Sequence, residues 1–395
     1  MPPSFQEAAP ILKQLTAHGN EAYIVGGAVR NFLLGKPVED IDITTSAGPE
    51  DVRALFKKTI PVGIEHGTVI VRHNHRSYEV TTFRTESDYD DHRRPSSVSF
   101  VSSLEEDLKR RDFTMNAIAM SETGEIVDPF SGREAIRTGK IQTVGRAEER
   151  FREDPLRMMR AVRFVSQLSF EMDGETREAV RRLAGELRHI SVERITVEFD
   201  KLLLGTDTRK AFTELADSGL YVYLPGLGDR GSLLNPLTER ALDPLSLLQE
   251  RWAVVAELLQ IEDPERWLRQ WKLSNQRIKE VSRILKALKA VGEGAWTPFL
   301  VYEYGQATAL SAERVRAFLR GCSVRLETVR SLHERLPIQS RSELALNGDD
   351  LLEWFQKKPG PWVADWLVKA EKAVIAGETA NDREAIRTWI EKQTY

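Results

Sequence analysis

Residues 22–45 read AYIVGGAVRNFLLGKPVEDIDITT, and this stretch decides the fold of the N-terminal part of the chain. Residues 22–25 form a short apolar run, and residues 38–44 contain isoleucines that alternate with polar side chains, so each segment is predicted to be a strand. Residues 28–34 between them are predicted to form a helix. A strand, a glycine turn, a helix and a second strand indicate a small mixed α/β sheet domain.

Two aspartates, Asp40 and Asp42, lie on the second predicted strand. Since residues two apart on a strand face the same side, both carboxylates can project from one face of the sheet. Two like charges held that close need a cation, and Mg²⁺ takes carboxylate oxygens together with substrate phosphates. A pair of such ions about 3.5–4 Å apart can stabilise both the attacking and the leaving oxygen of a displacement. An Asp-x-Asp alone is more often a surface turn, so the interpretation depends on its neighbours.

Three neighbouring features favour a phosphate site. Gly26 and Gly27 stand where backbone N–H groups at a helix N-terminus can cradle a triphosphate, although tight turns also need glycine. Arg30, one turn into the helix, adds a cation. Glu79 on a later predicted strand could be a third carboxylate that deprotonates a ribose 3′-hydroxyl or holds metal. It could equally be a cross-strand partner of a basic residue.

The remaining sequence changes in pattern along its length. Residues 68–72 and 77–83 predict a β-hairpin in the same sheet domain. Residues 85–100 are polar and turn-rich and contain Pro95, so we expect a mobile loop beside the sheet. After about Arg150 one helical pattern follows another, with no repeat period typical of solenoids.

The composition excludes several classes of protein. The 395 residues are enough for two to four packed units. No apolar run approaches the roughly 18 residues of a membrane span, and the first ten residues lack a signal pattern, so we expect a cytoplasmic protein that makes no membrane contact. Cys322 is the only cysteine, which rules out an internal disulfide and a cysteine-rich zinc site.

The net charge of −4 is an objection to a nucleic-acid partner, because phosphate binding usually requires a basic surface. The local charge matters more, and basic residues gather between Arg93 and Arg163. Such a run is most often a solvated helix face, so it supports phosphate contacts only together with other motifs.

Three ordered motifs point to one family. They are VGGAVR (25–30) with DIDITTS (40–46), RRDFTMNA (110–117) and EDPLRMMRAVRF (153–164), with weaker similarity at LNGDDL (346–351) and PGPW (359–362). This pattern resembles the class II tRNA nucleotidyltransferases and the related bacterial poly(A) polymerases. The resemblance implies an α+β fold with a polymerase-β-like head over residues 1–150 and elongated all-α parts after it: a neck (151–205), a body (206–330) and a tail (331–395).

The resemblance also implies roles for single residues. Asp40 and Asp42 would bind Mg²⁺, and Glu79 is a further catalytic candidate. The residues expected to bind the nucleotide are Gly27 and Arg30 at the triphosphate, Arg111 and Asp112 at the ribose, Asp154 and Arg157 at the base, and Asn116, Arg160 and Arg163 as further candidates. The implied partner is tRNA, the implied substrates are CTP and ATP, and a homodimer is one option.

Helix geometry supports part of this assignment. At 100° per residue, Asp154, Arg157 and Arg160 form one slanting strip on a helix that Pro155 would start at Asp154. The carboxylate of Asp154 would then have two competing roles, capping the helix and reading the base. Arg163 falls nearly opposite Asp154, so we expect it to meet tRNA or pack against the head. A surface helix with i,i+3 salt bridges is the alternative for the whole strip.

The activity implied by the resemblance is addition of CCA to the tRNA 3′ end, and three alternatives stay open. The first is a partial enzyme that adds only CC or only A; residues 85–100 favour A addition, since members that add only CC characteristically lack this segment. The second is a poly(A) polymerase, against which the compact length and the tail motifs argue. The third is a non-catalytic RNA-binding relative, which the intact Asp pair disfavours.

Overall fold

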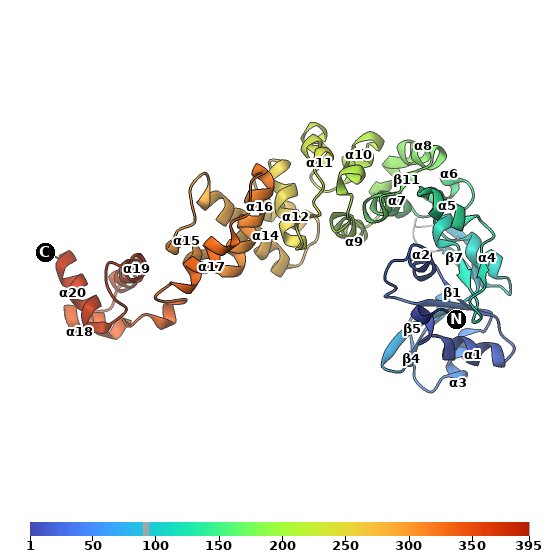
Figure 1. Cartoon of the computed structure of the whole chain (residues 1–395), viewed down its shortest axis with the longest axis horizontal. Helices are drawn as coiled ribbons and strands as arrows, with labels where there is room; N and C mark the ends of the chain where they lie inside the picture. The colour runs from blue at the N-terminus through green and yellow to red at the C-terminus, as the bar shows by residue number, and fades with distance from the viewer. Residues whose placement is uncertain (90–94, 395) are drawn as a thin grey trace. The chain divides into compact units, whose positions relative to one another are not determined.

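The computed structural model describes residues 1–89 and 95–394. The chain forms two compact units, Met1–Asp243 and Pro244–Tyr395 (Figure 1). The first unit contains a mixed sheet followed by helices, and the second unit is helical, which confirms the predicted fold class. The finer division into head, neck, body and tail stays a prediction.

One seven-stranded mixed sheet organises the N-terminal part of the first unit. Its strand order is β3-β4-β5-β2-β1-β8-β9. The central strand β2 pairs antiparallel with β1 and parallel with β5, so the predicted strands around the glycine turn become neighbours. The strands are β1 (Ala22–Val25), β2 (Asp42–Thr45), β3 (Thr59–Pro61), β4 (Thr68–His73), β5 (Arg76–Thr82), β8 (Ala119–Met120) and β9 (Ile126–Val127).

The core of the sheet explains the direction of the Asp pair. Ile41 and Ile43 are buried among apolar side chains of α1 (Ala9–Ala17) and α3 (Pro49–Leu55). Because side chains alternate along an extended chain, Asp40 and Asp42 turn away from this core, and both are exposed.

The prediction of a mobile loop over residues 85–100 is wrong for its two arms. These arms are β6 (Arg84–Tyr89) and β7 (Pro95–Phe100), which pair antiparallel. The ladder satisfies backbone groups that a polar loop would leave to water, and Pro95 is the first residue of its strand, where proline is tolerated. Residues 90–94, which include Arg93 and Arg94, lie outside the described residues.

Helices complete the first unit. Of these, α7 packs against both α9 and α10. The helices of this region are α2 (Gly27–Leu33), α4 (Leu104–Lys109), α5 (Gly132–Thr138), α6 (Ala147–Glu153), α7 (Leu156–Leu168), α8 (Gly174–Leu183), α9 (Val192–Leu203), α10 (Thr208–Ser218) and α11 (Asn235–Glu239).

The helix predicted to start at Asp154 begins two residues later, at Leu156, and the carboxylate of Asp154 caps it as predicted. Asp154 has extended backbone angles, φ −143° and ψ 98°, and lies between the end of α6 and the start of α7. The ring of Pro155 disfavours helical angles in the residue before it, so the two helices break at this point.

The second unit consists of helices around its own apolar core. Trp252, Trp267 and Trp271 pack edge to face in that core, with ring centroids 5.1–6.2 Å apart. Its helices are α12 (Leu248–Leu258), α13 (Pro264–Gln270), α14 (Asn275–Val291), α15 (Pro298–Tyr304), α16 (Gln306–Arg320), α17 (Leu326–Glu334), α18 (Gly348–Phe355), α19 (Pro361–Ala376) and α20 (Arg383–Thr394). Within residues 1–89 and 95–394, none of the helices combines the length and the apolar character that crossing a bilayer would require.

Candidate active site

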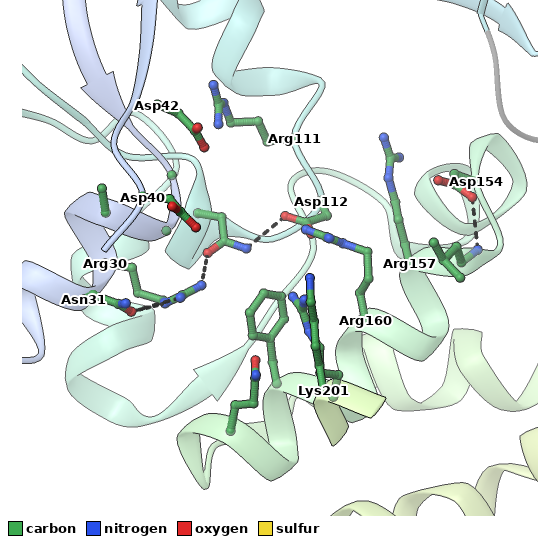
Figure 2. Close-up of a pocket in the computed structure, with 18 of the residues that line it drawn as sticks. Arg30, Asn31, Asp40, Asp42, Arg111, Asp112, Asp154, Arg157, Arg160 and Lys201 are labelled. Atoms are coloured by element: carbon green, nitrogen blue, oxygen red, sulfur yellow. Dashed lines mark hydrogen bonds and ion pairs between the residues drawn. The ribbon is translucent and has the colours of Figure 1, made fainter. Parts of the chain in front are cut away.

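A cavity of about 690 Å³ opens in the first unit between the sheet and the helices α7 and α9 (Figure 2). It brings together every residue that the sequence predicted to bind metal or nucleotide, with Glu79 as the one exception. Its lining comprises Gly26, Gly27, Ala28, Arg30, Asn31, Glu39, Asp40, Asp42, Arg110, Arg111, Asp112, Asn116, Asp154, Leu156, Arg157, Arg160, Arg163, Phe164, Gln167, Arg194 and Lys201.

The glycine turn at the cavity depends on the absence of a side chain. Gly26 has φ +72°, a conformation that favours glycine, and a Cβ atom there would lie 3.2 Å from Nη1 of Arg111. The carbonyl of Gly26 accepts the N–H of Arg30, which begins the hydrogen bonding of α2. The turn therefore brings the chain close to Arg111 and starts the helix that carries Arg30.

The Asp pair lies at one side of the cavity. Asp42 is directly opposite Glu79 in the parallel pairing of β2 and β5. Reduced solvation raises the pKa of Asp42, the charges of Glu79 and Asp40 raise it further, and Arg111 opposes them. Glu79 lies beside Asp42 but outside the lining of the cavity, and in the described chain no cluster of three acidic, histidine or cysteine side chains forms a metal-binding set.

These carboxylates fit a hard divalent cation. Asp40 and Asp42 present exposed carboxylate oxygens from one side of the extended chain, and a cation would neutralise the local excess of negative charge.

A hydrogen-bond network links three sequence motifs across the cavity (Figure 2). Arg30 Nη1 donates to Asn116 Oδ1 at 2.6 Å, and Asn116 Nδ2 donates to Asp112 Oδ1 at 3.0 Å. Arg160 Nε donates to Asp112 Oδ2 at 2.8 Å. Arg30 also donates to Asn31 Oδ1 through Nη2, at 2.9 Å. The network fixes two arginines whose free N–H groups remain available to an anionic ligand.

Charge and burial in this network are strongly coupled. Burial alone would raise the pKa of Asp112, but Arg160, Asn116 and the backbone N–H of Phe113 hold it well below its usual range. Burial lowers the pKa of Arg30 to about 10, and the positive charge of Arg163 adds to this effect. Asp112 is therefore ionised at neutral pH, and the cavity gathers positive charge that an anion would stabilise.

Asp107 anchors the side chain of Arg111, and the sequence reasoning missed it. Its fully buried carboxylate accepts from Arg110 Nε at 3.1 Å and from Arg111 Nη2 at 3.2 Å, and Thr44 Oγ1 lies 3.3 Å from it. The spacing was the available signal, because Asp107 on α4 precedes Arg110 and Arg111 by three and four residues, the separations at which helical side chains meet.

Asp154 lies on the opposite side of the cavity from the Asp pair (Figure 2). Its Oδ1 accepts the backbone N–H of Leu156 at 3.1 Å, and its Oδ2 accepts from Arg194 Nη2 at 2.6 Å. The carboxylate thus caps the start of α7 and is held by α9. Arg157 donates to the carbonyl oxygens of Arg150 and Arg110, at 3.0 and 3.1 Å, so its guanidinium is held in a fixed position beside Asp154.

Arg163 lines the cavity, which differs from the position expected for it. That expectation measured the helical angle from Asp154, which is not part of the helix. Arg163 Nε lies 3.2 Å from Glu198, and its guanidinium lies 4.0 Å from the ring centroid of Phe164. Burial lowers the pKa of Arg163 to about 10, although Glu198 opposes this.

Further lining residues were missed by the sequence reasoning, notably Arg194 and Lys201 on α9. They are seven residues apart and so share one face of the helix. Lys201 points into the cavity (Figure 2), is exposed, and forms no ion pair with any side chain that the structure describes. Helical spacing in residues 192–203 was the available signal, but nothing in the sequence shows that this face meets α7.

Family comparisons match three parts of the chain. Residues 22–142 match the poly A polymerase head domain. Residues 169–229 match a probable RNA- and SrmB-binding site of polymerase A. Residues 245–390 match a putative domain 2 of tRNA nucleotidyltransferases.

Relatives match nearly the whole chain. The CCA-adding enzyme of Geobacillus thermodenitrificans (strain NG80-2) is 51% identical over 393 residues, which are 99% of this chain and 97% of the relative. The CCA-adding enzyme of Bacillus mycoides (strain KBAB4) is 49% identical over 390 residues, 98% of each chain. A crystal structure of the Bacillus stearothermophilus CCA-adding enzyme in complex with CTP has a TM-score of 0.95 and 49% identity, and covers 100% of this chain and 98% of that one.

Proposed function

The chain belongs to the CCA-adding enzyme family and is a tRNA nucleotidyltransferase, and we propose that it adds C, C and A in turn to the tRNA 3′ end, from CTP and ATP, in the cavity described above. The observation that carries this proposal is that one cavity joins a carboxylate pair, a set of arginines and the Asp154–Arg157 pair. Relatives of the same length support it, since the Bacillus stearothermophilus enzyme was crystallised with CTP.

In each step the 3′-hydroxyl oxygen of the tRNA attacks the α-phosphorus of the nucleotide. A new P–O bond forms, the bond to the β-phosphate oxygen breaks, and pyrophosphate leaves. Asp40 and Asp42 would hold Mg²⁺, which supplies Lewis-acid stabilisation of the attacking and leaving oxygens. Glu79 lies opposite Asp42 on the neighbouring strand β5, and it would receive the hydroxyl proton or stabilise the metal-binding pair.

The triphosphate and the ribose would lie across the buried network. Gly27 opens α2 and offers backbone N–H groups, and Arg30 and Arg163 supply positive charge. Arg111 and Asp112 would contact the ribose hydroxyls, since a guanidinium donates and a carboxylate accepts. Positioning by fixed groups accounts for catalysis here, with no covalent intermediate.

Asp154 and Arg157 would select the base. Cytosine and adenine both offer an exocyclic amine beside a ring-nitrogen acceptor, which a carboxylate and a guanidinium match. Uracil and guanine present a carbonyl beside a ring N–H, so the same pair would oppose acceptor to acceptor and donor to donor. The hydrogen bonds that hold both side chains support this role, because fixed groups discriminate better than mobile ones.

The three alternative activities are not favoured. The relatives that match at about 50% identity over their whole length are CCA-adding enzymes, not partial enzymes or poly(A) polymerases. The hairpin of β6 and β7 is present, which agrees with A addition. We also place the protein in the cytoplasm, where tRNA is processed, and the homodimer stays a prediction.

The direct test uses purified protein and a tRNA transcript that lacks its last three nucleotides. With CTP and ATP together, the product should be three nucleotides longer and end in CCA. With CTP alone it should stop after two residues. A product that ends at CC with both nucleotides present, or a long poly(A) extension, would overturn the proposal.

A further inference from the structure

Asp107, on α4, carries a carboxylate that the proposed reaction does not use. Its side chain is completely buried, and it lies outside the lining of the active-site cavity. Burial alone would raise the pKa of Asp107, but the charges of Arg110 and Arg111 lower it below the usual range. An ionised carboxylate removed from water is stable only through its partners, so these partners show what Asp107 does.

The two oxygens of Asp107 hold different partners. Oδ1 accepts from Arg110, through Nε at 3.1 Å and through Nη2 at 2.9 Å. Oδ2 accepts from Arg111 Nη2 at 3.2 Å, and the hydroxyl Oγ1 of Thr44 lies 3.3 Å from the same oxygen. Oδ2 therefore joins Arg111 to β2, the strand that begins at Asp42.

Arg111 stands between two carboxylates. Thr44 is two residues beyond Asp42 on β2, so both side chains leave the same face, about 7 Å apart along the strand. Asp107 lies at the Thr44 position, and Arg111 lines the cavity beside Asp42 (Figure 2). Burial raises the pKa of Asp42, and the positive charge of Arg111 opposes that rise, so these two groups interact.

Arg111 pairs with only one of these two carboxylates. In the described part of the chain its ion pair is with Asp107, and it forms none with Asp42. Its Nε is buried and has no hydrogen-bond partner among the described residues. An arginine with unused donors beside an exposed carboxylate is expected to turn toward it unless another anion holds the guanidinium. Asp107 is that anion.

We propose that Asp107 is a positioning residue that holds Arg111 away from Asp42 and so keeps the Asp pair free for metal. This proposal rests on the proposed function, since it assumes that Asp40 and Asp42 hold a divalent cation. If Asp107 lost its charge, Arg111 would pair with Asp42, and a cation would have to displace it before binding. A metal ion and a guanidinium compete for the same carboxylate oxygens, because the same negative charge attracts both.

A purely structural role for Asp107 makes a different prediction. If Asp107 only stabilised α4, its loss would lower the free energy of unfolding, and the metal affinity of the folded protein would not depend on Arg111. If Asp107 holds Arg111 away from Asp42, removing Arg111 should cancel the effect of removing Asp107. A double-mutant cycle therefore separates the two roles.

The test counts bound Mn²⁺ by electron paramagnetic resonance, with the full-length protein and Mn²⁺ alone as the probe. Asp42→Ala identifies the site, because it should remove the metal bound by the Asp pair. Asp107→Asn keeps the shape of the side chain and should raise the Kd for Mn²⁺ about 10-fold, the effect of one competing charge-assisted hydrogen bond. Asp107→Asn in an Arg111→Met background should bind Mn²⁺ as tightly as Arg111→Met alone.

Three further measurements guard against a general folding defect. Glu106→Gln is the matched control, since Glu106 is exposed on the same helix and its loss should leave the Kd unchanged. Asp107→Ser, which leaves room for a water molecule, replaces Asp107→Asn if that variant does not fold. In extension assays, excess Mg²⁺ should restore most of the kcat of Asp107→Asn, and the preference for CTP over UTP should match the wild type.

Each outcome decides between the two roles. An unchanged Kd for Mn²⁺ in Asp107→Asn would overturn the proposal and leave nucleotide addition as proposed. An equal loss of Mn²⁺ affinity with and without Arg111 would also overturn it, because Asp107 would then act on the fold as a whole. If Asp42→Ala binds Mn²⁺ like the wild type, the metal assignment of the proposed function fails, and this proposal fails with it.

Discussion

Arg194 donates a hydrogen bond to Oδ2 of Asp154 at 2.6 Å, although 40 residues separate them in sequence. The bond ties α9 to the break between α6 and α7. The other carboxylate oxygen of Asp154, Oδ1, accepts the backbone N–H of Leu156. Two donors on different elements therefore set the orientation of this carboxylate. A base-reading carboxylate held in this way can discriminate by geometry.

The first prediction concerns base selection. Asp154→Ala should lower kcat/KM for CTP and ATP. It should also reduce the ratio of these values to the kcat/KM for UTP and GTP, because each mismatched base edge costs on the order of 1–3 kcal/mol in the wild type. Steady-state assays with all four nucleotides measure this directly. An unchanged selectivity ratio would show that Asp154 is only a helix cap.

Arg194 should act through Asp154. Arg194→Met keeps the apolar stem but removes the donor, so we expect reduced selectivity in the same direction as Asp154→Ala, with a smaller loss. The double variant should be no worse than Asp154→Ala alone, since the two residues act as one unit. Glu193→Ala, an exposed position one residue earlier, is the control. Additive losses in the double variant would contradict this relationship.

Lys201 should contribute charge to nucleotide binding. Removing one charge-assisted hydrogen bond costs about 1.5–3 kcal/mol, so Lys201→Ala should raise KM for CTP and ATP by roughly 10-fold or more with little change in kcat. Lys13→Ala, on the exposed side of α1, should leave both constants unchanged. A fall in kcat at unchanged KM would instead place Lys201 at the reacting atoms.

The buried Asp112 should make stability depend on pH. Its pKa is lower in the folded protein than the unfolded value of about 3.9. A depressed carboxyl pKa contributes stability that is present above the unfolded pKa and is lost as pH falls through the folded pKa. The wild type should therefore lose stability steadily below about pH 4, whereas Asp112→Asn should be less stable at pH 7 and lose less on acidification. Urea midpoints measured from pH 7 to pH 3 test this, and parallel curves for the two proteins would contradict it.

The sequence predicted the elements around the glycine turn well, because their signals are local. Gly26 is placed by a turn, and Asp40 and Asp42 by alternation along one short extended segment, although the strand predicted over residues 38–44 is shorter than expected and begins at Asp42. The motifs at residues 110–117 and 153–164 line the cavity beside them, as their order suggested.

What the sequence could not supply depends on contacts between distant segments. Arg194 and Lys201 reach the cavity only because α9 packs on α7, which no local pattern encodes. The break at Asp154 follows from Pro155, but the helical spacing of the arginines after it suggested that the helix already included Asp154. The strands β6 and β7 are stabilised by pairing with each other, and their polar composition gave no signal for strands in the sequence.

The central claim is that Asp40 and Asp42 hold the catalytic metal. The most direct measurement compares Asp40→Ala and Asp42→Ala with the wild type for nucleotide incorporation into CCA-lacking tRNA in Mg²⁺, alongside tRNA binding by anisotropy. We predict that both variants incorporate no nucleotide and bind tRNA with nearly wild-type Kd, because these carboxylates contact metal rather than RNA. Substantial incorporation by either variant would contradict the assignment and place the metal site elsewhere.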